Sequence, residues 1–274
     1  MRTVVLTGGT SGVGYGVAQG LQAQEHRVVA LVRSLERGRA LLPGATLVEC
    51  DLSSQASVAT AAEEILRTEE HIDVLVGCAG VVPWKRATSV DGFELTWATN
   101  ILGHVRLTDL LRPRLIGSAP SRVVMISGNA HRKGTIHWDD LQLTRSYSAI
   151  RAGTQAALAK IMWTFWLARE LEGTGVTANT FCPGFVRSGL TRGFPWWLRP
   201  LVGLGHLVAQ TPAEGARTPL WLATDPAHAQ TTGGFFRHLA PRDTSAESLD
   251  PKAQARLAEE IARMLTPEAP PVSP

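Results

Sequence analysis

The chain has 274 residues, of which 44% are apolar and 19% are charged, and its formal net charge is +3. This length and composition are typical of one α/β domain with a substantial core, and the scattered Lys and Arg residues exclude a basic stripe for nucleic acid. The three cysteines lack metal-ligand spacing, so we expect no metal site and small cysteine side chains in the core of a protein from a reducing compartment.

The chain begins with a strand pattern that runs directly into a glycine-rich turn. Apolar residues 4–6 precede the turn T-G-G-T-S-G-V-G at 7–14, and a helical pattern follows to about Gln24. A strand that starts this early leaves no room for a signal peptide or an N-terminal anchor, and no apolar run is long enough to span a bilayer. We therefore expect a cytoplasmic protein without a membrane segment.

Strand patterns then alternate with helical patterns along the chain. The expected strands are 3–6, 27–32, 46–48, 74–76, 122–126 and 176–181, and the expected helices are 13–24, 56–68, 93–115 and 152–171. This alternation predicts an α/β fold, a doubly wound Rossmann fold with a central parallel β-sheet flanked by helices. We expect a single domain over 1–265, with a substrate-covering segment at 189–210 and a disordered, proline-rich tail at 266–274.

The glycine-rich turn has the position of a phosphate-binding loop, since it follows a strand and opens a helix. Glycines there allow a tight turn and a close backbone approach to a pyrophosphate, which the helix N-terminus stabilises. The next strand ends at Val32-Arg33-Ser34, where an NAD site would carry an acidic residue for the ribose 2′-hydroxyl. Arg33 would instead pair with a 2′-phosphate, so we expect NADPH/NADP to be preferred over NAD.

Several motifs together resemble the short-chain dehydrogenases/reductases, in particular their retinol-dehydrogenase-like branch. They are the turn at 7–14, Asp51-Leu52, Cys78-Ala79-Gly80, Asp91-Gly92-Phe93-Glu94, Asn100-Ile101-Leu102-Gly103-His104, Ala130-His131, Asp140-Leu141-Gln142 and Pro183-Gly184-Phe185-Val186-Arg187-Ser188. The resemblance covers roughly residues 1–236 and implies Asp51 at the adenine, Gly80 beside a ribose and Ser188 near the nicotinamide carboxamide. Gly77-Cys78 departs from the family's usual pair of asparagines.

The motifs and the resemblance together assign a set of residues to the cofactor. These candidate cofactor-binding residues are Gly8, Thr10, Ser11, Gly12, Val13, Gly14, Arg33, Ser34, Asp51, Leu52, Cys78, Ala79, Gly80, Pro183, Gly184, Val186 and Ser188.

The chemistry that the resemblance implies requires a serine, a tyrosine and a lysine one helical turn after the tyrosine. Aligned between Ser127-Gly128-Asn129-Ala130-His131 and Glu172-Gly173-Thr174-Gly175 without insertion, these positions hold Gly128, Gly153 and Ala157. Asn100 alone remains of the usual four catalytic residues. Ser127 is present, but neighbouring strand residues point to opposite faces, so it does not simply replace residue 128.

Other residues offer weaker substitutes for the missing acid. Tyr147 has Arg151 four residues later, but accepting this pair would shift the alignment by six residues against both flanking motifs. His131 matches a structural Ala-His of the family. Lys160 is expected to be a solvated or ribose-side lysine rather than a catalyst.

We therefore expect an NADPH-dependent ketoreductase in which the substrate supplies the proton, for example from a neighbouring phenol, because positioning alone supports hydride transfer. Glycines at the tyrosine and serine positions leave room for a bulky substrate, as in atypical reductases of aromatic polyketide biosynthesis, which the chain loosely resembles. The candidate substrate residues are Gly128, His131, Gly153, Trp196 and Trp197. Two alternatives remain: a nucleotide-binding pseudoenzyme, and a non-redox cyclase or lyase.

The expected helix 152–171 is apolar nearly all round, with Met162, Trp163, Phe165, Trp166 and Leu167 in sequence. A helix of this kind is buried on both sides. One side must face the sheet, and the other predicts a homodimer or homotetramer contact, as the resemblance also implies.

Overall fold

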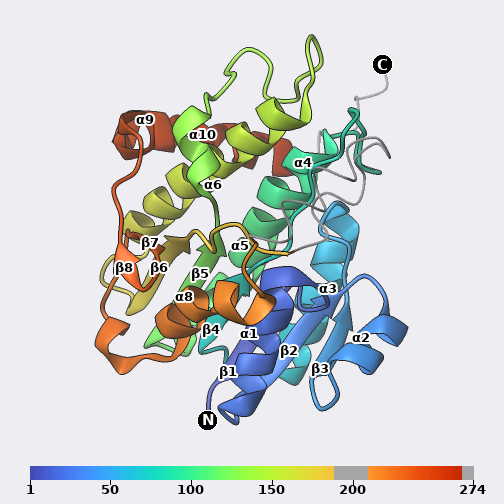
Figure 1. The fold of residues 1–274 in the computed structure, drawn as a ribbon, viewed down its shortest axis with the longest axis vertical. Helices are drawn as coiled ribbons and strands as arrows, with labels where there is room; N and C mark the ends of the chain where they lie inside the picture. Colours follow the sequence, from blue (N-terminus) through green and yellow to red (C-terminus); the bar gives the residue numbers. More distant parts are fainter. Residues whose placement is uncertain (188–208, 267–274) are drawn as a thin grey trace, which may run out of the picture.

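The computed structural model describes residues 1–187 and 209–266, and an eight-stranded sheet organises them (Figure 1). The strand order is β3-β2-β1-β4-β5-β6-β7-β8, parallel except for the last pair. The strands are β1 Thr3–Thr7, β2 Arg27–Val32, β3 Thr46–Glu49, β4 Val74–Gly77, β5 Ser121–Ile126, β6 Val176–Phe181, β7 Phe235–Arg237 and β8 Ala240–Pro241. The expected doubly wound Rossmann fold is confirmed.

Helices cover both faces of the sheet. They are α1 Gly12–Ala23, α2 Leu35–Leu41, α3 Gln55–Thr68, α4 Leu95–Trp97, α5 Gly103–Gly117, α6 Ala149–Glu170, α8 Pro212–Thr224, α9 Ala246–Leu249 and α10 Pro251–Leu265. Short helical turns join them at η1 Ala98–Leu102, η2 Asn129–Lys133 and η5 Pro226–His228. The first of these, η1, is a π-helical turn, so the expected helix 93–115 is interrupted directly before α5.

Alternate residues of each strand enter two separate cores, as the pleat of a strand requires. Val5 and Leu75 face a core formed with α3, α5, α6 and α10, whereas Leu6 and Val76 face one formed with α1 and α8. In Figure 1, α1 and α8 lie side by side over the sheet. Thr211 caps α8 with Pro212 in the first turn, as its sequence predicts, and Glu214 completes a capping box.

The long helix α6 begins three residues earlier than expected because the Ser148 side chain caps it by accepting from the Arg151 N–H. Met162, Trp163, Phe165 and Leu167 are buried within one chain, where α9 and α10 pack against α6 (Figure 1), whereas Trp166 is half-buried. Most of this helix is thus buried without a second subunit, and the homodimer or homotetramer stays a prediction.

Candidate functional site

The glycine-rich turn is shaped as a cradle. A Cβ added at Gly8, whose φ is +76°, would lie 2.8 Å from the Ala79 backbone nitrogen, and one at Gly14 would collide with the Gly8 carbonyl group. Ser11 is the N-cap of α1, but its side chain makes no capping hydrogen bond, and the first helical turn contains no acidic residue. The turn therefore presents backbone N–H groups, a hydroxyl and the positive end of the helix dipole, which suit a pyrophosphate.

A hydroxyl beneath this turn connects it to the end of β4. Thr7 is buried, and its Oγ1 accepts hydrogen bonds from the backbone N–H groups of Cys78 (3.1 Å) and Ala79 (3.2 Å). The same hydroxyl lies 3.0 Å from Nε2 of His104, and Nδ1 of that ring lies 3.3 Å from the Asn100 carbonyl oxygen. Thr7 thus anchors the turn that Gly77-Cys78 cannot anchor through asparagine side chains, a role that sequence reasoning missed.

Two arginines flank the place where the second strand ends. Arg33 is exposed just beyond β2, and Ser34 caps α2 by accepting from the Arg37 N–H at 3.2 Å. The Arg37 guanidinium donates to the Thr10 carbonyl oxygen at 3.3 Å, so it joins α2 to the glycine-rich turn. Arg37 was not among the sequence candidates. The sequence feature that could have indicated Arg37 is its position four residues after Arg33, one helical turn further along α2.

Asp51 and Leu52 follow β3 at the same edge of the sheet. The Oδ1 atom of Asp51 accepts from the backbone N–H and the hydroxyl of Ser53, at 2.9 and 2.8 Å. Leu52 is buried, and its carbonyl group packs against Gly103 at the start of α5. The hydrogen bonds from Ser53 thus orient the exposed Asp51 carboxylate, which lies at the same edge of the sheet as the glycine-rich turn.

Asn100 lies in the π-helical turn and acts as a clamp on the segment after β4. Its Oδ1 accepts from the Val81 N–H at 2.8 Å, and its Nδ2 donates to the Val81 carbonyl oxygen at 3.0 Å. Gly80 lies against the same side chain. Both ends of the amide are thus used to hold the backbone, so the structure places Asn100 in a positioning role.

The end of β5 meets the middle of α6 where the family positions of serine, tyrosine and lysine fall. The Ser127 hydroxyl donates a hydrogen bond to the Ala157 carbonyl oxygen at 2.8 Å. This bond joins β5 to α6, and it uses the hydroxyl hydrogen that a substrate carbonyl would need. A Cβ added at Gly128 would approach no described atom closer than the Ala130 nitrogen at 3.9 Å. A Cβ at Gly153 would meet only Val82 among the described residues, at 3.5 Å. Side chains are therefore absent from positions where there is room for them.

Two of the possible substitute acids are held elsewhere. His131 is fully buried with its ring 5.0 Å from that of Phe235, and its Nδ1 lies 2.8 Å from the Gly128 carbonyl oxygen. Burial lowers the pKa of His131, which favours a neutral core histidine. The Tyr147 hydroxyl donates to the Pro83 carbonyl oxygen at 2.6 Å, and burial raises the pKa of this phenol. Tyr147 also precedes α6, which carries Gly153 and Ala157.

Lys160 differs most from its expected environment. Its side chain is 3% exposed rather than solvated, and among the described residues its Nζ atom has no hydrogen-bond partner. Burial lowers the pKa of Lys160 to about 7. Burial, followed by the positive charge of Lys160, holds the pKa of His104 well below its ordinary value.

The segment after β6 is described as far as Arg187. Gly184 has φ +84°, and Val186 forms a bridge with Gln210 and packs against Gly215 of α8. Pro183, Gly184 and Val186 thus lie at the carboxyl end of β6, on the nucleotide-motif side of the sheet. Ser188, Trp196 and Trp197, together with most of segment 189–210, lie outside the described residues.

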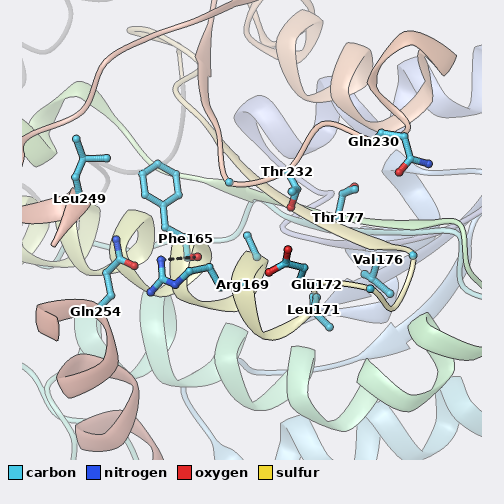
Figure 2. A pocket seen from close by; sticks show the side chains of 14 residues that line it. Phe165, Arg169, Leu171, Glu172, Val176, Thr177, Gln230, Thr232, Leu249 and Gln254 are labelled. Atoms are coloured by element: carbon cyan, nitrogen blue, oxygen red, sulfur yellow. Dashed lines mark hydrogen bonds between the residues drawn. The ribbon is translucent and has the colours of Figure 1, made fainter. Parts of the chain in front are cut away.

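A cavity of about 720 Å³ lies at the opposite end of the sheet (Figure 2). It is lined by Arg169 near the end of α6, by Glu172 in the turn that follows, by Val176 and Thr177 at the start of β6, and by Gln254 of α10. The nucleotide motif follows the carboxyl ends of the strands, where ligands of open α/β sheets bind. This cavity is therefore not the candidate site.

Residues 1–187 and 209–266 hold neither a membrane-spanning helix nor a metal-binding cluster. None of the helices there is long and apolar enough to cross a membrane. The same residues contain no group of three or more His, Cys, Asp or Glu side chains arranged to hold a metal ion.

Comparisons with known proteins agree with this geometry. Residues 2–197 match the family described as short chain dehydrogenase. Human retinol dehydrogenase 14 is 35% identical over 96% of this chain and 84% of its own length. The crystal structure of an uncharacterized protein from Mycobacterium paratuberculosis has a TM-score of 0.80 at 30% identity, over 98% of this chain and 95% of that one. The Pseudomonas aeruginosa RhlG/NADP active-site complex has a TM-score of 0.69 at 26% identity, over 86% and 93%.

Proposed function

The chain belongs to the short-chain dehydrogenase family, and we propose that it is an NADPH-dependent ketoreductase whose bulky aromatic substrate supplies the proton itself. The observation that carries the proposal is the contrast within one site. The glycine-rich turn is free of side chains at Gly8 and Gly14, as a pyrophosphate requires, whereas positions 128 and 153 are glycines with open space at their Cβ positions. An aromatic, polyketide-like ketone is a substrate of the size and chemistry that this contrast favours.

The residues present fit a dinucleotide. Gly8 and Gly14 keep the cradle free of side chains, Ser11 offers an unused hydroxyl, and Thr7 fixes the facing β4 turn. Asp51 would bind on the adenine side, and Arg33 would bind a 2′-phosphate. NADPH, when bound, supplies a hydride to the carbonyl carbon of the substrate.

The carbonyl oxygen then needs a proton, and the described residues at the family's catalytic positions provide none. Gly128 and Gly153 have no side chain, and the Ser127 hydroxyl is engaged with the Ala157 carbonyl oxygen. A phenol beside the ketone supplies the missing step: its O–H bond breaks, an O–H bond forms on the former carbonyl oxygen, and a phenolate remains. The chain's part is to orient the ketone and to exclude water.

A matched pair of substrates tests this function. An aryl ketone with a neighbouring phenol should oxidise NADPH faster than its methyl ether by about 10²–10⁴-fold, the usual contribution of a general acid. The rates are measured from NADPH absorbance, and the alcohol product is identified by mass spectrometry. Equal rates for the two ketones would contradict proton transfer from the substrate. NADPH binding without oxidation by any ketone would instead favour a pseudoenzyme or a non-redox catalyst.

Charge reversal at the end of β2 tests the cofactor preference. Arg33→Asp should weaken NADPH binding by about 10- to 100-fold, since a hydrogen bond to a charged group contributes about 1.5–3 kcal/mol, and NADH binding should weaken far less. Binding is followed by quenching of tryptophan fluorescence. Arg39→Asp makes the same charge change on the exposed surface of α2 and should leave both affinities nearly unchanged. Equal losses of NADPH and NADH affinity in Arg33→Asp would contradict recognition of the 2′-phosphate.

A further inference from the structure

His104, the second residue of α5, is a buried imidazole that joins three segments around the nucleotide motif. Its side chain belongs to a residue that is only 1% exposed. Nε2 lies 3.0 Å from the Thr7 hydroxyl at the end of β1, and Nδ1 lies 3.3 Å from the Asn100 carbonyl oxygen in η1. Both ring nitrogens therefore have a polar partner, which an apolar side chain of the same size could not offer.

The hydrogen atoms of this network can be assigned by counting donors and acceptors. A threonine hydroxyl has one hydrogen and two lone pairs. The Thr7 oxygen accepts from the backbone N–H groups of Cys78 and Ala79, at 3.1 and 3.2 Å, and these two bonds use both lone pairs. The Thr7 hydrogen is therefore donated to Nε2 of His104, so the ring hydrogen is on Nδ1 and points to the Asn100 carbonyl oxygen. Burial keeps this ring neutral by holding its pKa well below the ordinary value.

The same ring fills the space beside the last residue of β4. A Cβ added at Gly77 would lie 2.9 Å from Cδ2 of His104 and 3.2 Å from its Nε2, and it would collide with the Met125 sulfur. The imidazole thus occupies the room that a side chain at position 77 would need, and from there it reaches Thr7. Without an acceptor at position 104, the buried Thr7 hydroxyl would have to turn its hydrogen elsewhere, and its lone pairs would leave the two N–H groups.

The turn that Thr7 holds is part of the nucleotide cradle. A Cβ added at Gly8 would lie 2.8 Å from the Ala79 backbone nitrogen, so the glycine-rich turn and the β4 turn are in close contact. On the other side of His104, the Asn100 side chain clamps the segment that follows this turn. One imidazole therefore connects the glycine-rich turn to the clamp.

We propose that His104 is a positioning residue for the bound nucleotide: it accepts from the Thr7 hydroxyl and donates to the Asn100 carbonyl oxygen, and it thereby holds the β4 turn against the glycine-rich turn. The inference rests on the proposed binding of NADPH. The ring acts through Thr7 and supplies no proton to the substrate. Its loss should therefore weaken nucleotide binding rather than remove a chemical step.

Two variants separate the acceptor from the packing of the ring. His104→Phe keeps a buried ring and removes the acceptor, whereas His104→Gln keeps an acceptor for the Thr7 hydroxyl. His104→Phe should weaken NADPH binding about 10-fold, the usual order for a buried hydroxyl that loses its acceptor, and His104→Gln should retain most of the affinity. Binding is measured by calorimetric titration below the unfolding temperature of each variant. Equal losses in the two variants would indicate a packing effect and would overturn the proposal.

A double-mutant cycle tests whether His104 acts through Thr7. Thr7→Val removes the hydroxyl and should weaken NADPH binding as much as His104→Phe does, and the double variant should lose no more than either single variant. Thr164→Val makes the same exchange at a buried threonine of α6, whose hydroxyl donates to the Lys160 carbonyl oxygen, and it should leave NADPH binding unchanged. Additive losses in the double variant would contradict action through Thr7.

Nitrogen NMR of the imidazole reports the tautomer of the wild type directly and needs no variant. The ring should carry its hydrogen on Nδ1, and a hydrogen on Nε2 would overturn the proposal, as would an unchanged NADPH affinity in His104→Phe. Failure of the wild type to bind NADPH would overturn this proposal and the proposed function together. NADPH binding that depends on His104, without oxidation by any ketone, would leave this inference standing and remove only the reductase.

Discussion

The triple substitution Gly128→Ser, Gly153→Tyr, Ala157→Lys should raise the rate at which the protein reduces ketones without a phenol by about 10²–10⁴-fold, the usual contribution of general acid catalysis. The Cβ atoms of the new serine and tyrosine fit without a clash, because a Cβ at Gly128 or Gly153 meets described neighbours no closer than 3.5 Å. The new tyrosine and lysine would be one helical turn apart on α6 and therefore on one face. The measurement is NADPH oxidation with a methyl-ether ketone under saturating cofactor.

A size-matched variant separates chemistry from packing. Gly128→Ala, Gly153→Phe, Ala157→Met adds comparable volume without a proton donor, so it should not accelerate the same reaction. This size-matched variant should be more stable than the wild type, since replacing a glycine within α6 removes a penalty of about 0.5–1 kcal/mol. If the first variant binds NADPH as the wild type does and still reduces no ketone, the nicotinamide end is not placed for hydride transfer, and the pseudoenzyme becomes the better interpretation.

Lys160→Met should also stabilise the nucleotide-free protein, by on the order of 4 kcal/mol at pH 7. The pKa of Lys160 falls from an ordinary 10.5 to about 7 in the folded protein. Between pH 7 and 10.5 the Lys160 amine is therefore protonated in the unfolded chain and largely neutral in the folded protein. As the pH falls through this range, protonation increasingly favours the unfolded chain, so the free energy of unfolding decreases. Below pH 7 the penalty is complete, and above 10.5 it vanishes. Urea unfolding of both proteins at pH 7 and near pH 10 measures the difference.

The stability gain of Lys160→Met should thus shrink as the pH rises. Lys133→Met removes an exposed lysine from η2 and should show no comparable dependence on pH. A gain that is the same at both pH values would mean that the amine is not held in an unfavourable protonation state. A lower stability of Lys160→Met at pH 7 would show that the amine makes a stabilising contact in the fold.

Much of the fold follows from local patterns. The expected strands 27–32 and 176–181 agree with β2 and β6, and the glycine-rich turn lies where its flanking strand and helix place it. The last two strands of the sheet, β7 and β8, have only three and two residues, too few for an alternating pattern, so they were not expected. The helix α10 begins with Asp250 as N-cap and Pro251 in its first turn, a signal that was present but not used.

The site was predictable only where a residue type determines its own role. Gly8 in the turn is an example, since the absence of a Cβ allows its close approach to Ala79, whereas the role of Arg33 stays a prediction. The contact of Thr7 with His104 joins residues 97 positions apart, and no local pattern reports it. Burial of Lys160 likewise depends on the packing of α6 within the fold, whereas a lysine taken alone is expected to be solvated.

The hydrogen bonds of Thr7 and Asn100 have a consequence for how this scaffold can change over time. They hold the β4 turn and the following segment through contacts that do not involve residues 128, 153 or 157. Loss of an acid, a base or an orienting hydroxyl at those three positions leaves that framework intact. Substitutions at these three positions can therefore change the chemistry of the protein while the fold stays stable.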